Sequence, residues 1–172
     1  MIRLLLISVL LLASAAAADA RDIQPHFFDP SLGDFKAELS AAKSQGKKGV
    51  LLMFELEDCP FCLRMKQTIL NQPEVQEYYR RNFLIFSVDA EGGNPVVDFG
   101  GRETTEKKFA LGNRVRATPV FLFFDLSGKP VARFTGAAKD AGEFLALGRY
   151  VVEGAYERMP FAKYKQLQGV AR

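Results

Sequence analysis

The only two cysteines of the sequence, Cys59 and Cys62, lie together in the segment "EDCPFC". Two thiols at this spacing can form a reversible redox pair, supply half of a metal site or make a static disulfide. If Cys59 ends a strand and Pro60 opens the following helix, the Cys59 sulfur faces unpaired backbone N–H groups and the positive end of the helix dipole. Both favour the thiolate, which is the nucleophile of disulfide exchange. We therefore interpret Cys59 as the attacking cysteine and Cys62, one turn later, as the cysteine that resolves the mixed disulfide.

The other interpretations of the pair fit the sequence less well. A structural zinc site needs four ligands, whereas the chain has one C-x-x-C pair and one histidine, His26, so a zinc ion would have to be shared between two copies. Covalent haem requires a histidine directly after the second cysteine, and that position is Leu63. A static disulfide that closes so short a loop restricts the unfolded chain little. The sequence therefore favours a redox pair with no bound metal.

The composition of the chain indicates one exported domain. Residues 1–20 combine Arg3, the apolar run "LLLISVLLLA" and the small-residue end "ADA", which is typical of a cleaved secretory signal peptide. The apolar run is too short to span a bilayer, and a retained anchor is the alternative. Cleavage removes one charge of each sign, so 23 basic and 20 acidic residues become 22 and 19, and the net charge stays at +3. Such a mild charge does not indicate binding to nucleic acid. Residues 21–172 are long enough for a single domain with an adequate core.

The elements around the cysteines are predicted from hydrophobic patterns. The run "GVLLMFEL" is continuously apolar, as expected for a strand buried on both faces of a sheet, and "FLIFSVDA" returns to the short apolar pattern of a strand. Helical spacing of apolar residues predicts helices at 35–42, 63–72, 73–82, 104–113 and 139–156. The dipeptide Ser127-Gly128 joins two further apolar runs and indicates a β-hairpin.

Two segments carry no such pattern. Residues 91–101, "EGGNPVVDFGG", lack the glycine spacing of a phosphate-binding loop and are expected to form a mobile surface loop. The basic tail, residues 158–172, is expected to be loosely ordered. The other elements form two βα units followed by a hairpin and a closing helix. This order predicts an α/β fold in which a central mixed β-sheet is flanked by helices.

A second feature of the predicted site is Thr118-Pro119, directly before the apolar run "VFLFF". Proline cannot donate to a ladder within a sheet, so Pro119 belongs at the entrance of a strand. The segments "LLMFELEDCPFC" and "RVRATPVFLFFDLSGKPVARFTG" and the final amphipathic helix together resemble the thioredoxin family over most of the chain. In detail the sequence is most similar to the SoxW-type periplasmic thioredoxins. The resemblance implies the thioredoxin fold, here with an N-terminal helical extension.

The resemblance also implies how a substrate would bind. In the thioredoxin family the proline at the position of Pro119 is cis and lies against the C-x-x-C pair. The backbone of the preceding residue, here Thr118, pairs with the substrate chain as an added strand. We expect Phe61 to be half exposed and to contact extended substrates together with Pro60 and Thr118. The alternative is that Phe61 is a buried core ring.

One feature of the family is missing from this sequence. Thioredoxins carry a buried aspartate six residues before the first cysteine, where it accepts the proton of the resolving thiol, and here this position is Met53. Glu55, two residues further along the strand, or Glu57 in the following loop is the candidate replacement in this proton relay. The alternative for Glu55 is a charge that faces solvent.

The charges near the pair favour a reductase over an oxidase. Phe61 offers the attacking thiol neither a charge nor a conventional hydrogen bond, and Glu57 and Asp58 oppose its ionisation. The downstream cations Arg64 and Lys66 would offset this effect only if they did not point to solvent. A less stabilised thiolate belongs to a more reducing couple, so we expect a potential of roughly −180 to −270 mV, between those of protein disulfide isomerase and thioredoxin. A DsbA-like oxidase and a non-catalytic thioredoxin-scaffold binding or redox-sensing module are the alternatives.

Together these inferences predict a periplasmic thiol–disulfide oxidoreductase that is a monomer and has the Cys59–Cys62 disulfide as its only redox group. Its substrates would be protein or small-molecule disulfides. A reductase outside the cytosol needs electrons delivered across the membrane. The family resemblance therefore implies a membrane thiol electron donor of the DsbD or CcdA type.

Overall fold

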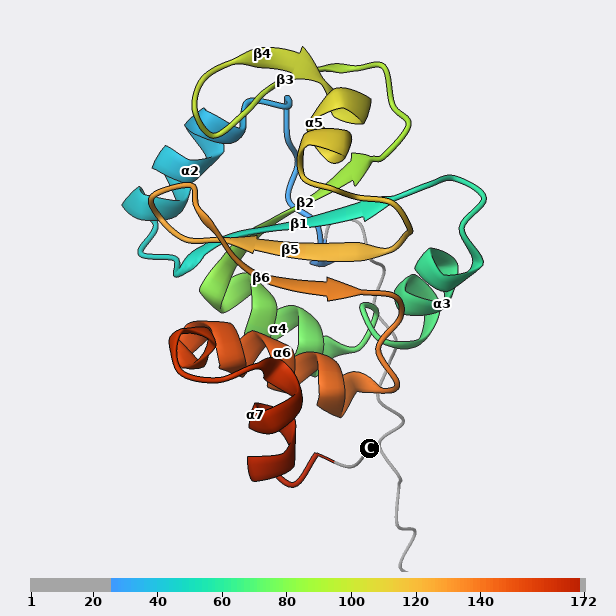
Figure 1. Cartoon of the computed structure of the whole chain (residues 1–172), viewed down its shortest axis with the longest axis vertical. Helices are drawn as coiled ribbons and strands as arrows, with labels where there is room; N and C mark the ends of the chain where they lie inside the picture. The colour runs from blue at the N-terminus through green and yellow to red at the C-terminus, as the bar shows by residue number, and fades with distance from the viewer. Residues whose placement is uncertain (1–25, 171–172) are drawn as a thin grey trace, which may run out of the picture.

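The computed structural model describes residues 26–170, and the predicted signal peptide, residues 1–20, lies outside this range. At its centre is a four-stranded sheet of order β2-β1-β5-β6 (Figure 1). The strands are β1 (Gly49–Glu55), β2 (Phe83–Asp89), β5 (Val120–Phe124) and β6 (Pro130–Thr135). β1 is parallel to β2, whereas β5 is antiparallel to both of its neighbours. The mixed sheet predicted from the sequence is confirmed.

Helices cover both faces of the sheet (Figure 1). One face carries α2 (Phe35–Ser44) and α5 (Glu106–Gly112), the other carries α4 (Pro73–Asn82) and α6 (Ala141–Val152), and α3 (Pro60–Thr68) follows the end of β1. Successive side chains of β1 alternate between the faces. Leu51 and Met53 pack on the α4–α6 side, and Leu52 and Phe54 pack on the α2–α5 side. Because β1 is buried on both faces, its sequence is an unbroken apolar run.

Aromatic rings join the two helices of the α4–α6 face. Tyr79 of α4 stacks on Phe144 of α6 with ring centroids 4.5 Å apart, and the Tyr79 hydroxyl donates a hydrogen bond to the Phe144 carbonyl. A Cβ added at Gly148 would lie 2.8 Å from the Tyr78 ring and 3.1 Å from the Tyr79 ring, so glycine permits this close packing. Burial raises the pKa of Tyr79 well above its ordinary value.

Residues 91–101, predicted to form a loop, contribute instead to a second, two-stranded sheet. Its strands are β3 (Pro95–Val97) and β4 (Glu103–Thr105), which pair antiparallel. The Asp98 carboxylate closes the turn between them, because it accepts hydrogen bonds from the N–H groups of Gly100 and Arg102, each at 2.9 Å. Burial of Asp98 opposes its charge, but the hydrogen bonds from Arg102 and Gly100 outweigh this effect and lower the pKa of the carboxyl. A side chain that bonds to the backbone, and not hydrophobic periodicity, therefore shapes this segment.

The C-terminal segment is also more ordered than its basic composition predicts. After the short helix η1 (Ala155–Glu157), α7 (Phe161–Leu167) packs against α6 (Figure 1). Tyr164 is buried, and its hydroxyl donates a hydrogen bond to the Glu153 carboxylate at 2.8 Å. Burial, together with this negatively charged partner, raises the pKa of Tyr164 to about 12. The prediction of a loose tail is wrong for residues 161–167, since two aromatic residues three positions apart form an apolar face on a helix.

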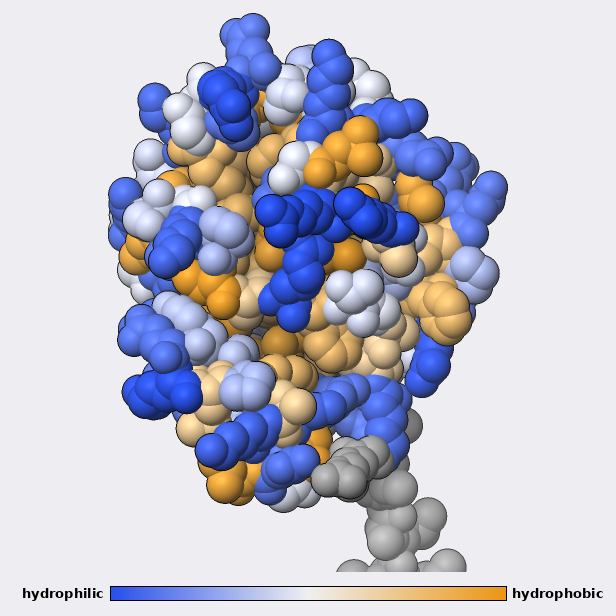
Figure 2. Space-filling view, in the orientation of Figure 1, coloured by the Kyte–Doolittle hydropathy of each residue, from blue (hydrophilic) through white to orange (hydrophobic). Residues whose placement is uncertain are grey.

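No helix within residues 26–170 has the length and the apolar character that are needed to cross a membrane. Figure 2 shows hydrophilic side chains spread over one face of the molecule, with apolar side chains in small patches between them. On this face, apolar surface therefore does not gather into one large area of the kind that marks many interaction sites.

Candidate active site

α3 begins directly at the cysteine pair. Cys59 is the N-cap residue of this helix and has an extended backbone, and Pro60 is its first residue, where a proline loses no helical hydrogen bond. The backbone N–H of Cys62 donates a hydrogen bond to the Cys59 sulfur at 3.1 Å. The Cys59 sulfur therefore lies at the positive end of a helix of nine residues, in an environment that stabilises a thiolate.

The two cysteines form a disulfide, with their Cα atoms 5.2 Å apart. Both are buried, but unequally: Cys59 is 8% exposed and Cys62 is 2% exposed. A molecule that approaches from solvent therefore meets Cys59 first. This is the order of access that the predicted roles of the two cysteines require.

Thr118 and Pro119 lie on the β5 side of the pair. The peptide bond between them is cis. β5 pairs with β1 so that Val120 lies opposite Phe54, and this register places Pro119 at the end of β1 from which the chain continues to the cysteines. Thr118 makes no hydrogen bond with any residue in the described range. Its backbone N–H and C=O groups are therefore not used by the described residues.

A cavity of about 330 Å³ lies on the other side of the pair, where α3 meets the ends of β1 and β2. Both cysteines form part of its wall. The other residues that line it are mostly charged or apolar: Glu55, Leu56, Glu57, Leu63, Lys66, Ser87 and Asp89. The β5 side of the disulfide thus presents backbone groups, whereas the β2 side presents charged side chains.

An ion pair forms one wall of this cavity. Lys66 Nζ lies 2.5 Å from Glu55 Oε2, and the Glu55 side chain is only 15% exposed. The Ser87 hydroxyl donates a hydrogen bond to the other oxygen of the Glu55 carboxylate. The alternatives in which Glu55 or Lys66 points to solvent are therefore wrong, although Arg64 is exposed. Lys66 follows the buried Cys62 by four residues, and this spacing, which puts both on the inner face of the helix, is the sequence signal that identifies the wall.

The other predicted site residues have different surroundings. Phe61 is 57% exposed, so the alternative of a buried core ring is wrong. Pro60 is also exposed, and Glu57 is exposed at the rim of the cavity. Met53 is fully buried in the core. Glu55, two residues further along the same strand, is therefore the acid of β1 that reaches the cavity.

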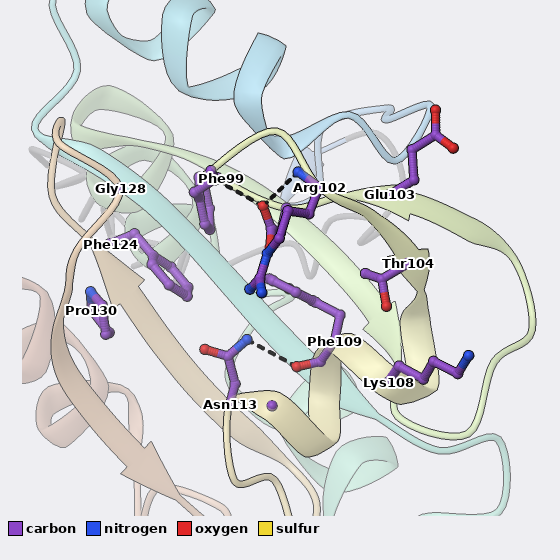
Figure 3. A pocket seen from close by; sticks show the side chains of 13 residues that line it. Phe99, Arg102, Glu103, Thr104, Lys108, Phe109, Asn113, Phe124, Gly128 and Pro130 are labelled. Carbon is purple, nitrogen blue, oxygen red and sulfur yellow. Dashed lines mark hydrogen bonds and ion pairs between the residues drawn. The ribbon is translucent and has the colours of Figure 1, made fainter.

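A larger cavity, of about 520 Å³, lies elsewhere in the molecule (Figure 3). It is bounded by the β3–β4 hairpin, α5 and the turn between β5 and β6, and Figure 3 shows the rings of Phe99, Phe109 and Phe124 around it. Its Arg102 is already paired with Asp98 at 2.9 Å. Phe124 ends β5, so this cavity lies away from the disulfide, which is near the start of that strand. In the described range, no cluster of three or more histidine, cysteine or carboxylate side chains is placed to hold a metal ion.

Known proteins share the fold of this chain. A family model for a thioredoxin-like domain matches residues 35–152. A thioredoxin-fold protein from Helicobacter pylori is similar in structure, with a TM-score of 0.60, 21% identity and coverage of 72% of this chain and 86% of that one. A thioredoxin from Thermus thermophilus matches with a TM-score of 0.55 and 28% identity, and the match covers 69% of this chain and 84% of that one. The reduced C-terminal domain of DsbD from Neisseria meningitidis matches with a TM-score of 0.51 and 21% identity, and the match covers 67% of this chain and 91% of that one. No curated protein matches the sequence.

The family match includes the parts of the molecule that form the site. It spans the four strands of the central sheet, the C-x-x-C pair and Thr118-Pro119. This match identifies the thioredoxin-like family but does not distinguish the SoxW-type subgroup within it. Because the family model covers more than half of the chain, the protein belongs to the thioredoxin-like domain family.

Proposed function

We propose that the protein is a thiol–disulfide oxidoreductase that reduces disulfides in the periplasm. The observation that carries this function is the position of Cys59. Its sulfur is the more exposed of the pair, caps the N-terminus of α3 and accepts a hydrogen bond from the Cys62 N–H. These features favour a thiolate at Cys59 when the disulfide is reduced. Membership of the thioredoxin-like family supports the same chemistry.

The reaction consists of two exchanges that together transfer two electrons to the substrate. In the reduced protein, the Cys59 thiolate attacks one sulfur of the substrate disulfide, the substrate S–S bond breaks, and one substrate thiolate leaves. Cys62 loses its proton and attacks the Cys59 sulfur, the mixed disulfide breaks, and the second substrate thiolate leaves. The products are two substrate thiols, once protonated, and the Cys59–Cys62 disulfide that the structure holds. A dithiol donor then reduces the protein by the same steps in reverse.

The second exchange needs a base for the Cys62 thiol, which is almost fully buried. Glu55 is the proton acceptor in this proposal, because its carboxylate lines the same cavity as Cys62. Lys66 and Ser87 hold that carboxylate in place. Glu57, exposed at the rim of the cavity, completes the relay to solvent.

Substrate binding uses the β5 side of the pair. The available backbone groups of Thr118 pair with an extended segment of the substrate as an added strand. The exposed ring of Phe61 and the neighbouring Pro60 supply apolar contact. Backbone pairing does not depend on the side chains of the substrate, so this side suits varied protein disulfides.

The charges near the pair support the reductive direction. Glu57 and Asp58 are exposed acids close to Cys59 in the sequence, and the ammonium of Lys66 is neutralised by Glu55. The Cys59 thiolate therefore gains its stabilisation from the helix and little from cations in the cavity, which favours a potential in the range of roughly −180 to −270 mV. The electrons come from a membrane thiol donor of the DsbD or CcdA type. The redox-active disulfide is the only cofactor that this monomeric enzyme needs.

Turnover with a dithiol donor tests this function. The purified protein should catalyse reduction of insulin by dithiothreitol, and Cys59→Ser should lower the rate to that of dithiothreitol alone. Reduced Cys62→Ser, freed of dithiothreitol and then mixed with insulin, should instead accumulate a mixed disulfide with the substrate, visible by mass spectrometry under non-reducing conditions. A folded wild-type protein that gives no turnover, or a Cys62→Ser variant that traps nothing, would contradict the two-step mechanism.

The direction of the reaction is tested separately, by equilibrium titration of the Cys59–Cys62 couple against glutathione and dithiothreitol. A potential close to about −270 mV, the value of thioredoxin, supports a reductase. A potential close to about −120 mV, the value of DsbA, overturns the charge-based inference and makes the protein an oxidase.

A further inference from the structure

We propose that the cavity beside Cys62 is a substrate subsite, and that it selects disulfides carrying a positively charged group a few bonds from the reacting sulfur. The inference rests on the proposed function, which supplies the reaction, and it adds the class of substrate. Its basis is one cavity whose wall contains both cysteines and an excess of carboxylates.

The location of the cavity makes it part of the reacting surface. Cys59 and Cys62 both line it, so the atoms next to a substrate sulfur bonded to Cys59 lie at its mouth. Thr118 lies on the opposite side, because β1 pairs with β2 along one edge and with β5 along the other. One part of a bound substrate can therefore pair with Thr118 while the part beyond its reacting sulfur enters the cavity.

The charges that line the cavity do not balance. Lys66, its one cation, is held by Glu55 at 2.5 Å. Within residues 26–170, Glu57 makes no hydrogen bond or ion pair. One oxygen of Asp89 accepts a hydrogen bond from the backbone N–H of Glu91 at 2.9 Å, which does not cancel its charge. Three carboxylates and one ammonium thus leave the lining with two net negative charges.

The remaining walls suit an aliphatic chain. Leu56 and Leu63 line the cavity, and Leu63 is 54% exposed although it is a large apolar residue. A lysine or arginine side chain has an aliphatic stem and a cationic tip, so its stem can cover leucine while its tip meets carboxylates. The volume of about 330 Å³ equals the liquid volume of roughly ten waters, which is room for one long side chain.

Three small disulfides of similar size provide the test. Cystamine carries two ammonium groups, bis(2-hydroxyethyl) disulfide is neutral, and 3,3′-dithiodipropionate carries two carboxylates. For each compound, kcat/KM is measured at neutral pH with dithiothreitol as donor. We expect the ratio of kcat/KM for cystamine to kcat/KM for dithiodipropionate to fall about fivefold in Asp89→Asn, as removal of one partly exposed charge predicts. The ratio should fall further when Glu57→Gln is added. A comparison of variant with wild type cancels the intrinsic reactivities of the compounds.

A matched control separates the local effect from the net charge of the chain. Glu157→Gln removes the same charge from an exposed side chain of η1, which follows the end of α6 far from α3 (Figure 1). It should leave the ratio unchanged. Asparagine at position 89 keeps an oxygen that can accept the hydrogen bond from Glu91, so the fold should persist, and thermal unfolding of each variant checks this.

The outcomes distinguish the subsite from the function on which it rests. If wild-type protein reduces none of the three compounds and no insulin, the proposed function itself fails. If it reduces all three but the ratio is the same in wild type, Asp89→Asn and the double variant, the enzyme stands and the charged subsite is overturned. A ratio that falls in Asp89→Asn and again in the double variant, but not in Glu157→Gln, supports the subsite.

Discussion

The two sides of the Cys59–Cys62 disulfide are built from different groups. On the β5 side, Thr118 offers a backbone N–H and C=O that no residue of the described range occupies. On the β2 side, the cavity offers carboxylates and one paired ammonium. Backbone groups bind extended chains whatever their side chains, whereas fixed charges discriminate among ligands. The two proposals accordingly assign binding of the substrate chain to the β5 side and selectivity among substrates to the β2 side.

The proposed mechanism assigns proton transfer to the β2 side as well. Met53 occupies the core position where thioredoxins carry an acid, and Glu55 lies two residues closer to the end of β1. Residues two apart on a strand face the same side of the sheet, so Glu55 keeps the direction of the missing acid but reaches the cavity. A charge that would be costly in the core thereby gains a cationic partner, Lys66.

The substitution Glu55→Gln should disrupt the β2 side most strongly. Loss of the base should slow resolution of the mixed disulfide by Cys62 about 100-fold near neutral pH, while attack by Cys59 on the substrate changes little. Single-turnover kinetics with acid quenching measure both steps, because the mixed disulfide accumulates when only the second step is slow.

Two further variants sharpen this prediction. Glutamine at position 55 leaves Lys66 without its anionic partner, and the double variant Glu55→Gln/Lys66→Gln restores the original net charge while the base stays absent. Resolution should be slow in both, and normal in the surface control Glu157→Gln. If Glu55→Gln resolved the mixed disulfide at the wild-type rate, Glu55 would not be the proton acceptor, and Glu57 would remain as the candidate.

The main elements of this fold could be predicted because burial leaves a pattern in the sequence. β1 and the first four residues of β2 are continuous apolar runs since both faces of the sheet are covered there, and the β5–β6 hairpin is marked by the turn at Ser127-Gly128. β3 and β4 have three residues each, too few for a period, and a single carboxylate, Asp98, organises them. The lysines of α7 make its sequence look like a solvated basic tail, although Phe161 and Tyr164 form the face of the helix that packs against the core.

The site could be predicted only in part for a related reason. Cys59, Pro60 and Cys62 are neighbours in the sequence, and local helix geometry sets how they lie. The wall of the cavity instead joins α3 to the ends of two strands, through Lys66 and Glu55. Which way a long lysine side chain turns depends on that tertiary packing, so the ion pair is visible only in the folded chain.

The substitution Phe61→Ser tests the exposed rim of the site, with a smaller expected effect. The ring is 57% exposed, so it should contribute apolar contact to a protein substrate and little to a small disulfide. We expect KM for insulin to rise about fivefold, with kcat/KM for cystamine unchanged. Leu111→Ser is the matched control, because Leu111 is 61% exposed on α5. Equal losses on insulin and cystamine would show that Phe61 acts on the cysteines themselves and not on the substrate.

The smallest expected effect on the site comes from α7, which should influence stability and neither side of the disulfide. Tyr164→Phe removes the hydrogen bond to Glu153 and should lower the free energy of unfolding at pH 8 by about 1 kcal/mol. The activities towards insulin, cystamine and dithiodipropionate should stay at wild-type values. A change in the ratio of the charged disulfides in this variant would mean that selectivity is spread through the scaffold and is not confined to the cavity.

The pH dependence of that stability difference is fixed by the titration of Tyr164. Its pKa is about 12 in the folded protein and about 10 for an ordinary tyrosine, so the unfolded chain loses this proton first as pH rises. The stabilisation is therefore complete below about pH 10 and is lost as pH rises to about 12. Other tyrosines also have raised pKa values. They are present in both the wild type and Tyr164→Phe, so they do not contribute to the difference between the two. Urea unfolding of the oxidised proteins should show the gap between wild type and Tyr164→Phe closing from pH 10 to pH 12, and a gap that stays constant would show that the buried hydroxyl is not protonated preferentially in the fold.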